Sequence, residues 1–215
     1  TLTDFLNQVG NDGYSLNYRI GMEGKKKIDS LGSEWDNDLF YNFTQNKADQ
    51  AFSTYNYSPY AITSAGDGTS DNKRHYFSAQ SDLKLKMKKR FTLETGVKAA
   101  FLSYNSVTNY FKEQPIGNRY KDAGRTNTFH YNENINAAYL QGSQTFGKDI
   151  ILKFGTRLEN TNMQGHQLVP DDTTFTIHRT DLFPYVYLSK NLMKIAGYEL
   201  RAYLVYRRTI SRPVY

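Results

Sequence analysis

Hydrophobic and polar residues alternate along much of this chain with a period of two. The first clear run has its apolar side at Leu16, Tyr18, Ile20 and Met22. Arg19 and Glu23 fall on the other side of the same run. Because successive side chains of a β-strand point to opposite faces, this period predicts a strand with one apolar face and one polar face.

A unit of two such runs joined by a short turn occurs four times. The units cover about residues 15–44, 77–101, 132–158 and 181–209, and their turns are Asp29–Ser33, Lys88–Arg90, Gly147–Asp149 and Met193–Gly197. The alternation fails in one run, Asn134–Leu140, whose faces stay unassigned. Two runs joined in this way indicate a β-hairpin. The pattern therefore predicts an all-β fold of about eight antiparallel strands in four hairpins.

The alternation also predicts which side chains share a face. We expect one continuous outward apolar surface formed by Leu16, Ile20, Leu39, Phe43, Leu83, Leu85, Leu93, Val97, Leu152, Phe154, Leu200 and Leu204. The opposite face carries charged residues along the strands, namely Arg19, Glu94, Lys98, Arg157, Glu159 and Arg201. A small closed soluble barrel fills its interior with mainly apolar side chains, whereas a wide membrane barrel has a wet lumen. A soluble antiparallel sheet packed on a core has the same period and remains an alternative.

The connections differ in length in a regular way. Those inside the hairpins are short, whereas residues 45–74, 106–131 and 162–180 form long polar connections between hairpins. Consecutive antiparallel strands place alternate connections at opposite ends of a sheet, so the short turns gather at one end. Bacterial outer-membrane barrels have short periplasmic turns and long extracellular loops. The expected fold is an antiparallel up-and-down transmembrane β-barrel, of which residues 1–215 form a part.

The composition agrees with strands that are wet on one face. There are 18 Tyr and 13 Phe, yet the mean hydropathy is −0.68. No run approaches the roughly 20 apolar residues of a membrane helix, whereas barrel strands need about 9 to 11 residues with every second one apolar. The absence of cysteine excludes disulfides, cysteine-ligated zinc and thiol catalysis. Thr1–Phe5 does not begin a signal peptide, so we expect a processed chain or an internal fragment.

The net charge of +6 does not predict nucleic-acid binding. Lys and Arg alternate with apolar residues in strands or lie in short turns, and neither an RNP-like motif nor a recognition helix accompanies them. The basic residues at or near the short turns are Lys25, Lys26, Lys27, Lys84, Lys86, Lys88, Lys89, Arg90, Lys148 and Lys194. We interpret them as a solvated periplasmic rim that also discourages edge pairing.

We expect no catalytic site, no metal site and no cofactor. The four histidines, His75, His130, His166 and His178, never occur at i, i+2 or i, i+4 separation. Loop residues that suit calcium are Asp67, Asp71, Asn72, Asp171 and Asp172, but they lack the EF-hand order, so solvated loop charges are the preferred interpretation. No Gly-x-Ser-x-Gly elbow is present. A small complete barrel with a structural, adhesive or hydrolytic role is one functional hypothesis for such a chain.

Four segments in order carry a family resemblance. They are Asn132–Leu140, Gly155–Thr161, Asp181–Pro184 and Tyr206–Pro213. These segments resemble the C-terminal barrel of Bacteroidetes-type TonB-dependent receptors, the outer-membrane β-barrel family, while residues 1–105 match it mainly in pattern. The resemblance implies a barrel in the cell outer membrane, closed by a plug domain, that takes up a scarce nutrient such as a metal chelate, a glycan or a peptide. The resemblance also implies that a TonB-type inner-membrane motor pulls on the plug to release the nutrient.

The chain departs from that family by showing no plug, no motor-binding box and about eight of the roughly 22 strands of such transporters. We therefore interpret it as part of a longer receptor, whose partners are outer-membrane lipid, the plug, the motor and, as a further candidate, a surface lipoprotein. The strands near Tyr14–Gly24 and Glu199–Thr209 should then not pair with each other. Candidates for stacking on a ligand are Tyr55, Tyr57, Tyr60, Tyr110, Phe111 and Tyr120, with an aromatic girdle or loop packing as the alternative.

Overall fold

The structure is a computed structural model that describes residues 5–57, 60–87, 90–147 and 149–210. Its strands are β1 (Phe5–Lys27), β2 (Glu34–Tyr57), β3 (Tyr60–Met87), β4 (Phe91–Glu113), β5 (Arg119–Lys121), β6 (Asn127–Phe146), β7 (Ile150–Val169), β8 (Thr173–Ile195) and β9 (Tyr198–Arg207). The described part of the chain contains no α-helix, and so none that is long and apolar enough to cross a membrane. The all-β class is thereby confirmed.

The strands form one antiparallel sheet in the order β1-β2-β3-β4-β6-β7-β8-β9, with the short β5 beside β4. The chain thus runs up and down from each strand to its neighbour, which confirms the prediction of about eight strands in four hairpins. The sheet is open, because β1 and β9 lie at its two edges and do not pair with each other within the described residues. The predicted absence of a ladder between the first and last strands is therefore confirmed.

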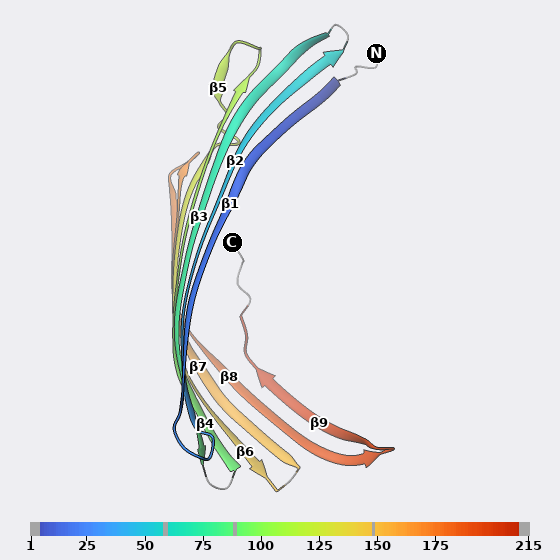
Figure 1. Cartoon of the computed structure of the whole chain (residues 1–215). Helices are drawn as coiled ribbons and strands as arrows, with labels where there is room; N and C mark the ends of the chain where they lie inside the picture. The colour runs from blue at the N-terminus through green and yellow to red at the C-terminus, as the bar shows by residue number, and fades with distance from the viewer. Residues whose placement is uncertain (1–4, 58–59, 88–89, 148, 211–215) are drawn as a thin grey trace.

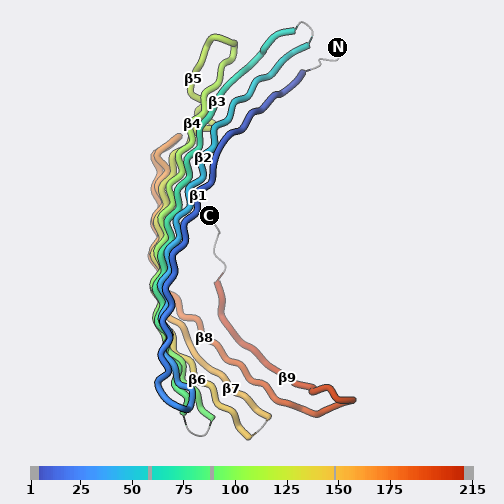
Figure 2. Tube along the Cα trace, viewed as in Figure 1, coloured from blue at the N-terminus to red at the C-terminus, as the bar shows by residue number. Residues whose placement is uncertain are grey.

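The sheet is a single curved layer. Figures 1 and 2 show the long strands bowed along their length, with the concave side on the right and the lower end of β8 and β9 turned toward that side. The two faces of the sheet therefore differ in curvature, which decides how tightly their side chains are packed.

The pairing register shows that the apolar residues share one face, because directly paired residues point to the same side of a sheet. One row across β1–β4 consists of Ile20, Tyr41, Phe77 and Phe101. All the residues of the predicted apolar surface fall on this face, and the six charged residues predicted to oppose them fall on the other. The register also assigns Asn134–Leu140, where Asn134, Ala138 and Leu140 lie on the apolar face.

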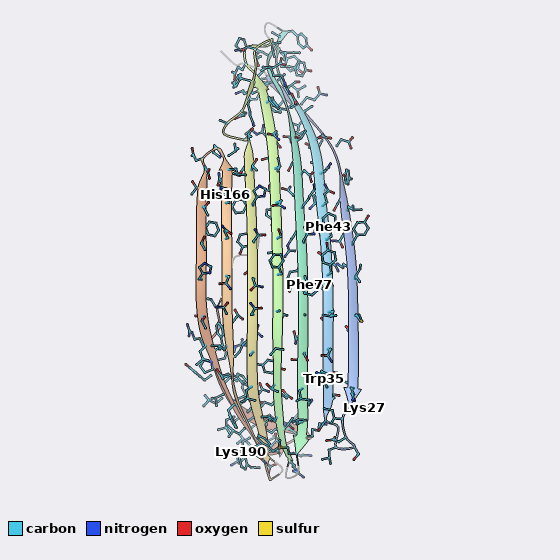
Figure 3. The ribbon with its side chains drawn as sticks, turned by 90° about the vertical axis from the view of Figure 1, so that its left-hand side faces the viewer. Lys27, Trp35, Phe43, Phe77, His166 and Lys190 are labelled. Carbon is cyan, nitrogen blue, oxygen red and sulfur yellow. The ribbon has the colours of Figure 1, made fainter. Side chains whose placement is uncertain are left out.

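The apolar face is the convex one. Strand residues that are buried, such as Asn42, Ser78 and Glu159, lie on the charged face, where concave curvature crowds the side chains. By contrast, Ile20 is 68% exposed and Val97 is 58% exposed. Figure 3 looks at the convex side and labels Trp35, Phe43 and Phe77 there. Since the buried apolar residues of the described chain are few, the sheet has no apolar core of its own, and its convex face suits contact with lipid.

The predicted long loops are wrong, because most of their residues continue the strands. β2 and β3 extend through nearly all of residues 45–74, and β7 and β8 through most of 162–180. β4 runs to Glu113 before the 106–131 connection becomes irregular. The hydrophobic alternation disappears in these stretches because both faces are polar, whereas the backbone ladder needs no apolar side chains. The strands therefore extend well beyond the roughly 25 Å apolar band of an outer-membrane barrel.

The short turns have the chemistry that their sequences suggest. Asp29 Oδ1 accepts hydrogen bonds from the backbone N–H groups of Leu31 and Ser33, each at 2.9 Å. The last hairpin turns at Ala196 and Gly197, whose φ values of 50° and 86° are those of the mirror-image turn favoured in hairpins. Predicted residues that lie outside the described residues are Thr1–Asp4, Lys88, Lys89, Lys148 and Ser211–Pro213.

Candidate functional site

The apolar band on the convex face slopes across the sheet. On β1 the band ends at Leu16, which lies in the same row across the sheet as Lys73 of β3. On β7 it ends at Leu158, whose row contains Ser81 of β3 and lies closer to the short turns. Strands tilted by about 35° to 45° in a membrane barrel produce such a slope. The parts of β1–β4 beyond this limit, toward the tip of the β2–β3 hairpin, are therefore exposed to water on both faces.

Aromatic rings mark the upper limit of the band on β1–β3. Tyr18 stacks on Phe43 with ring centroids 6.1 Å apart, and Phe43 lies 4.8 Å from His75. The hydroxyl of Tyr41 is 2.9 Å from Nδ1 of the same histidine. Amphipathic rings at this level match the aromatic girdle of outer-membrane barrels.

Beyond the band, the concave face of β1–β4 has an unusual charge distribution. We name this surface the upper concave wall; it comprises the concave-side residues from the row of Arg74 to the hairpin tips, together with Arg125 from the β5–β6 connection. Its cations are Arg74, Lys112 and Arg125, and none of its described strand residues is Asp or Glu. The acidic residues of β1–β3 at this level, Asp12, Asp49, Asp67 and Asp71, all lie on the convex face.

Arg125 lies beside two aromatic rings of the upper concave wall. Its guanidinium lies 5.2 Å from the ring centroid of Phe52 and 4.4 Å from that of Tyr110. One terminal nitrogen donates to Oε1 of Gln50 at 3.2 Å. Beside it is a hollow of about 300 Å³, whose polar and aromatic lining includes Asn7, Gln50, Phe52, Thr54 and Arg125. These contacts fix a cation at the edge of an open hollow.

Two glycines of β3 make this arrangement possible. A Cβ on Gly66 would come within 2.3 Å of the Phe52 ring, and a Cβ on Gly68 would come within 2.1 Å of the Tyr110 ring. The rings therefore lie over the bare backbone of β3 from its two neighbouring strands, β2 and β4. Glycine in a strand marks such a close approach.

Arg119 makes a similar contact on the opposite face but is neutralised there. Its guanidinium lies 3.9 Å from the ring centroid of Phe111 and bonds both carboxylate oxygens of Asp67, each at 2.9 Å. Asp67 and Phe111 are directly paired on the convex side. Arg119 is thus a clamp between β5, β4 and β3, whereas no carboxylate within the described residues pairs with Arg125.

Arg74 is a second cation of the wall, closer to the membrane band. It lies between Thr44 and Tyr104 in one concave row. Its Nε is buried and has no hydrogen-bond partner within the part of the chain that is described. A buried donor of a charged group without a partner is costly, so Arg74 is held in this row at a cost in stability.

The concave face at the level of the apolar band, which we name the lower concave wall, carries residues of opposite charge that form ion pairs with one another. Arg157 Nε donates to Glu159 at 3.1 Å, and Lys84 Nζ lies 3.8 Å from Glu94. Arg179 also pairs with Asp181. Alternating charges of this kind suit a water-filled lumen.

The structure places the candidate ligand residues at different sites. Tyr110 belongs to the Arg125 cluster, and Tyr120 of β5 pairs with Lys112. Phe111 faces the convex side beneath Arg119. Tyr60 contacts the rings of Tyr55 and Tyr57 at the tip of the β2–β3 hairpin. Sequence reasoning missed Phe52, Arg74 and Arg125; the alternating Gly66 and Gly68 were the available signal.

The histidines and loop carboxylates that the structure describes do not come together as a metal-binding site. His130 and His166 are directly paired across β6 and β7, which the sequence separation concealed. They contact Asn105 and Asp172, at 2.5 Å and 2.7 Å respectively. Among the described residues, no group of three His, Cys, Asp or Glu residues is placed to hold a metal ion.

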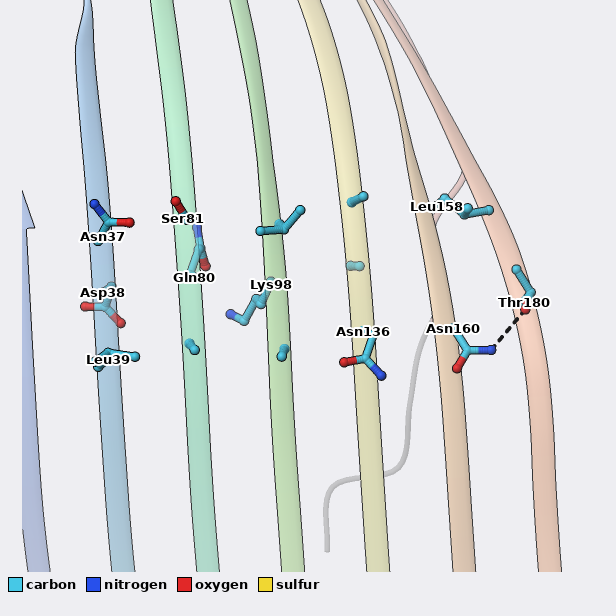
Figure 4. A pocket seen from close by; sticks show the side chains of 15 residues that line it. Asn37, Asp38, Leu39, Gln80, Ser81, Lys98, Asn136, Leu158, Asn160 and Thr180 are labelled. Carbon is cyan, nitrogen blue, oxygen red and sulfur yellow. Dashed lines mark hydrogen bonds between the residues drawn. The ribbon is translucent and has the colours of Figure 1, made fainter. Parts of the chain in front are cut away.

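A hollow of about 680 Å³ lies on the convex face of the sheet (Figure 4). Its floor is made of small residues, among them Ala79, Ala99 and Ala138, and at one side Asn160 donates to Thr180 at 3.1 Å. Since this face carries the apolar band, the hollow opens toward lipid and not toward a lumen.

Comparisons with known proteins found a family model and a solved structure that match most of this chain. The model of a family described as "Outer membrane protein beta-barrel family" matches residues 26–215. Among solved structures, a crystal structure of the ferric citrate transporter FecA in the unliganded form is similar at 11% identity and a TM-score of 0.43, covering 75% of this chain and 26% of that chain. This chain thus spans about a quarter of the length of that transporter. No curated protein matches.

Proposed function

The chain belongs to the outer membrane protein beta-barrel family, and we propose that within the outer membrane it forms part of the barrel wall of a TonB-dependent receptor that imports a scarce nutrient. Metal chelates, glycans and peptides are the nutrient classes in question. The proposal includes a transport function without catalysis, and it assigns the chain to the C-terminal barrel of a Bacteroidetes-type receptor on the four segments described above.

The open sheet with a charged concave face is the observation that carries this proposal. A barrel in lipid must close, because an unpaired N–H or C=O in the hydrocarbon region costs several kcal/mol. β1 and β9 each leave an edge without a partner among the described strands. Closure by further strands would give a barrel wide enough to keep Arg157, Glu159 and Lys98 in water.

A wide barrel needs a plug to avoid a permanent leak. We propose that a plug domain and the remaining strands belong to the same protein, that the plug contacts a TonB-type inner-membrane motor, and that a surface lipoprotein is a further candidate partner. The small complete barrel is disfavoured because its first and last strands would be hydrogen-bonded neighbours.

Growth tests distinguish the transport proposal. A strain lacking the gene and a strain lacking the inner-membrane motor are grown with a limiting supply of one metal chelate, glycan or peptide at a time. We expect at least one nutrient on which both strains fail while the parent grows, and on which the complete gene restores growth to the first strain. If every nutrient that requires this protein is still used without the motor, the protein is not a motor-driven receptor.

A further inference from the structure

We propose that the upper concave wall binds a small ligand carrying carboxylate or phosphate groups, with the guanidinium of Arg125 as its principal contact. The inference rests on the proposed function, because it names the chemical class of ligand that the receptor's outward-facing wall would take.

The sign of the charge on this surface selects an anion. The wall carries Arg74, Lys112 and Arg125, while the acidic residues of β1–β3 at the same level point to the convex side. A concave surface lined by charges of one sign concentrates ligands of the opposite sign. On the convex side, Lys47 and Lys73 lie beside Asp71 and Arg119 pairs with Asp67, whereas the described strand residues of the upper concave wall include no carboxylate.

A comparison of Arg119 with Arg125 shows which of the two arginines is available to bind an anionic ligand. Both guanidinium groups lie over aromatic rings in the same region of the sheet. The guanidinium of Arg119 donates hydrogen bonds to both carboxylate oxygens of Asp67. For Arg125, the side-chain hydrogen bond found among the described residues goes to the neutral Gln50. Arg125 also lines a hollow of about 300 Å³, in which a ligand carboxylate or phosphate can take the role that Asp67 has on Arg119.

The wall is also organised before a ligand arrives. Phe52 and Tyr110 both contact the Arg125 guanidinium, and Gly66 and Gly68 allow both rings to lie on the backbone of β3. Gln50, which accepts from Arg125, itself donates to Asn11 at 2.8 Å. A guanidinium fixed in this way loses little rotamer freedom when it bonds an oxyanion.

Arg74 adds a second positive charge further down the same wall, on the concave face between Thr44 and Tyr104. A ligand moving from the hairpin tips toward the lumen would pass Arg125 first and the charge of Arg74 afterwards, because Arg74 is six residues beyond Gly68 on β3.

Calorimetric titration of the complete protein in detergent tests the proposal. The probes are propane-1,2,3-tricarboxylate, inorganic phosphate and, as the neutral probe, glucose. We expect one or both anions to bind, with affinity that falls as salt rises, and glucose not to bind. Arg125→Gln should weaken anion binding by about 10- to 100-fold, since hydrogen bonds to charged groups are worth about 1.5–3 kcal/mol. The two anions separate carboxylate from phosphate recognition.

Arg119→Gln is the matched control, because it removes the same charge beside a ring on the opposite face and should leave anion affinity unchanged. Arg125→Lys keeps the charge but not the planar fork, and should bind with intermediate affinity. Circular dichroism and heat-dependent gel migration show whether each variant is folded. Equal anion affinity in wild type and folded Arg125→Gln, equal losses in Arg119→Gln and Arg125→Gln, or failure of wild type to bind either anion would overturn the proposal.

The titration and the growth tests fail independently. Suppose that anion binding depends on Arg125, but that the strain without the protein and the strain without the motor never fail on the same nutrient. This result would support the inference and reject the receptor function. Motor-dependent uptake that is unaffected by Arg125→Gln, with no anion bound in solution, would keep the receptor and reject this inference.

Discussion

The hydroxyl of Tyr139 on β6 donates a 2.6 Å hydrogen bond to Asp82 on β3, across the intervening strand β4. Gly96 of β4 is in direct register with both residues. The Tyr139 ring covers this glycine, and a Cβ there would lie 2.3 Å from Asp82 Oδ1 and 2.6 Å from the ring. Three strands of the concave wall are therefore joined by one side-chain contact over a bare backbone.

We expect Gly96→Ala to destabilise the barrel, because the new methyl group must displace Tyr139 or Asp82. Overpacking of this kind costs about 1–3 kcal/mol. The measurement is a urea unfolding titration of the complete protein refolded into vesicles. Gly24→Ala on β1 is the control, since nothing lies within 4 Å of its Cβ position. The same unfolding midpoint for both variants would contradict the close approach.

A charge on the convex face should cost much more than one on the concave face. Val97 is 58% exposed within the apolar band, so Val97→Arg should lose about 2–4 kcal/mol in a folding titration into lipid vesicles. Glu94 is on the concave face, 3.8 Å from Lys84, and Glu94→Arg should lose about 1 kcal/mol or less. Similar losses at the two positions would show that the faces are wrongly assigned.

The two edges should remain apart in the complete protein. The chain has no native cysteine, so introduced pairs can be cross-linked with a short bis-maleimide. Tyr18→Cys with Phe43→Cys should cross-link, because these residues are directly paired. Tyr18→Cys with Leu204→Cys, on β1 and β9, should not. Efficient linking of the second pair would mean that the sheet closes on itself as a small barrel.

The first short turn should weaken in acid. Hydrogen bonds from the Ser33 and Leu31 backbone to the Asp29 carboxylate lower the pKa of Asp29 from its usual 3.8. A group whose folded pKa is depressed contributes stability above its unfolded pKa, and that contribution is lost as the pH falls through the folded pKa. We therefore expect the stability difference between wild type and Asp29→Ala to be constant above about pH 5 and to shrink below about pH 4.

Hydrogen exchange of the 28–33 segment, followed by mass spectrometry at pH values across this range, gives the local measurement. Asp29→Asn retains an oxygen that accepts the two N–H bonds but does not titrate, so its protection should not change with pH beyond the intrinsic exchange rate. A pH dependence of wild type equal to that of Asp29→Asn would remove the carboxylate from the explanation.

The sequence by itself determined the strands that touch the membrane band. Leu16, Ile20, Leu39 and Val97 alternate with polar residues because lipid on one side and water on the other impose the period of two on the side chains. The order of the hairpins followed from the short turns, since an antiparallel neighbour needs only a few connecting residues. The same alternation gave no information where both faces are wet, which is why 45–74 was mistaken for a loop.

The tertiary structure decided which distant residues meet on one face. Phe52, Tyr110 and Arg125 come from three separate segments, and they meet because the register of β2, β3 and β4 brings Gly66 and Gly68 beneath the two rings. Register also separated Arg119 from Arg125, although the two are six positions apart in sequence. Register is weakly specified by sequence where both faces of a strand are polar, as in these stretches, so the pattern along one strand did not reveal it.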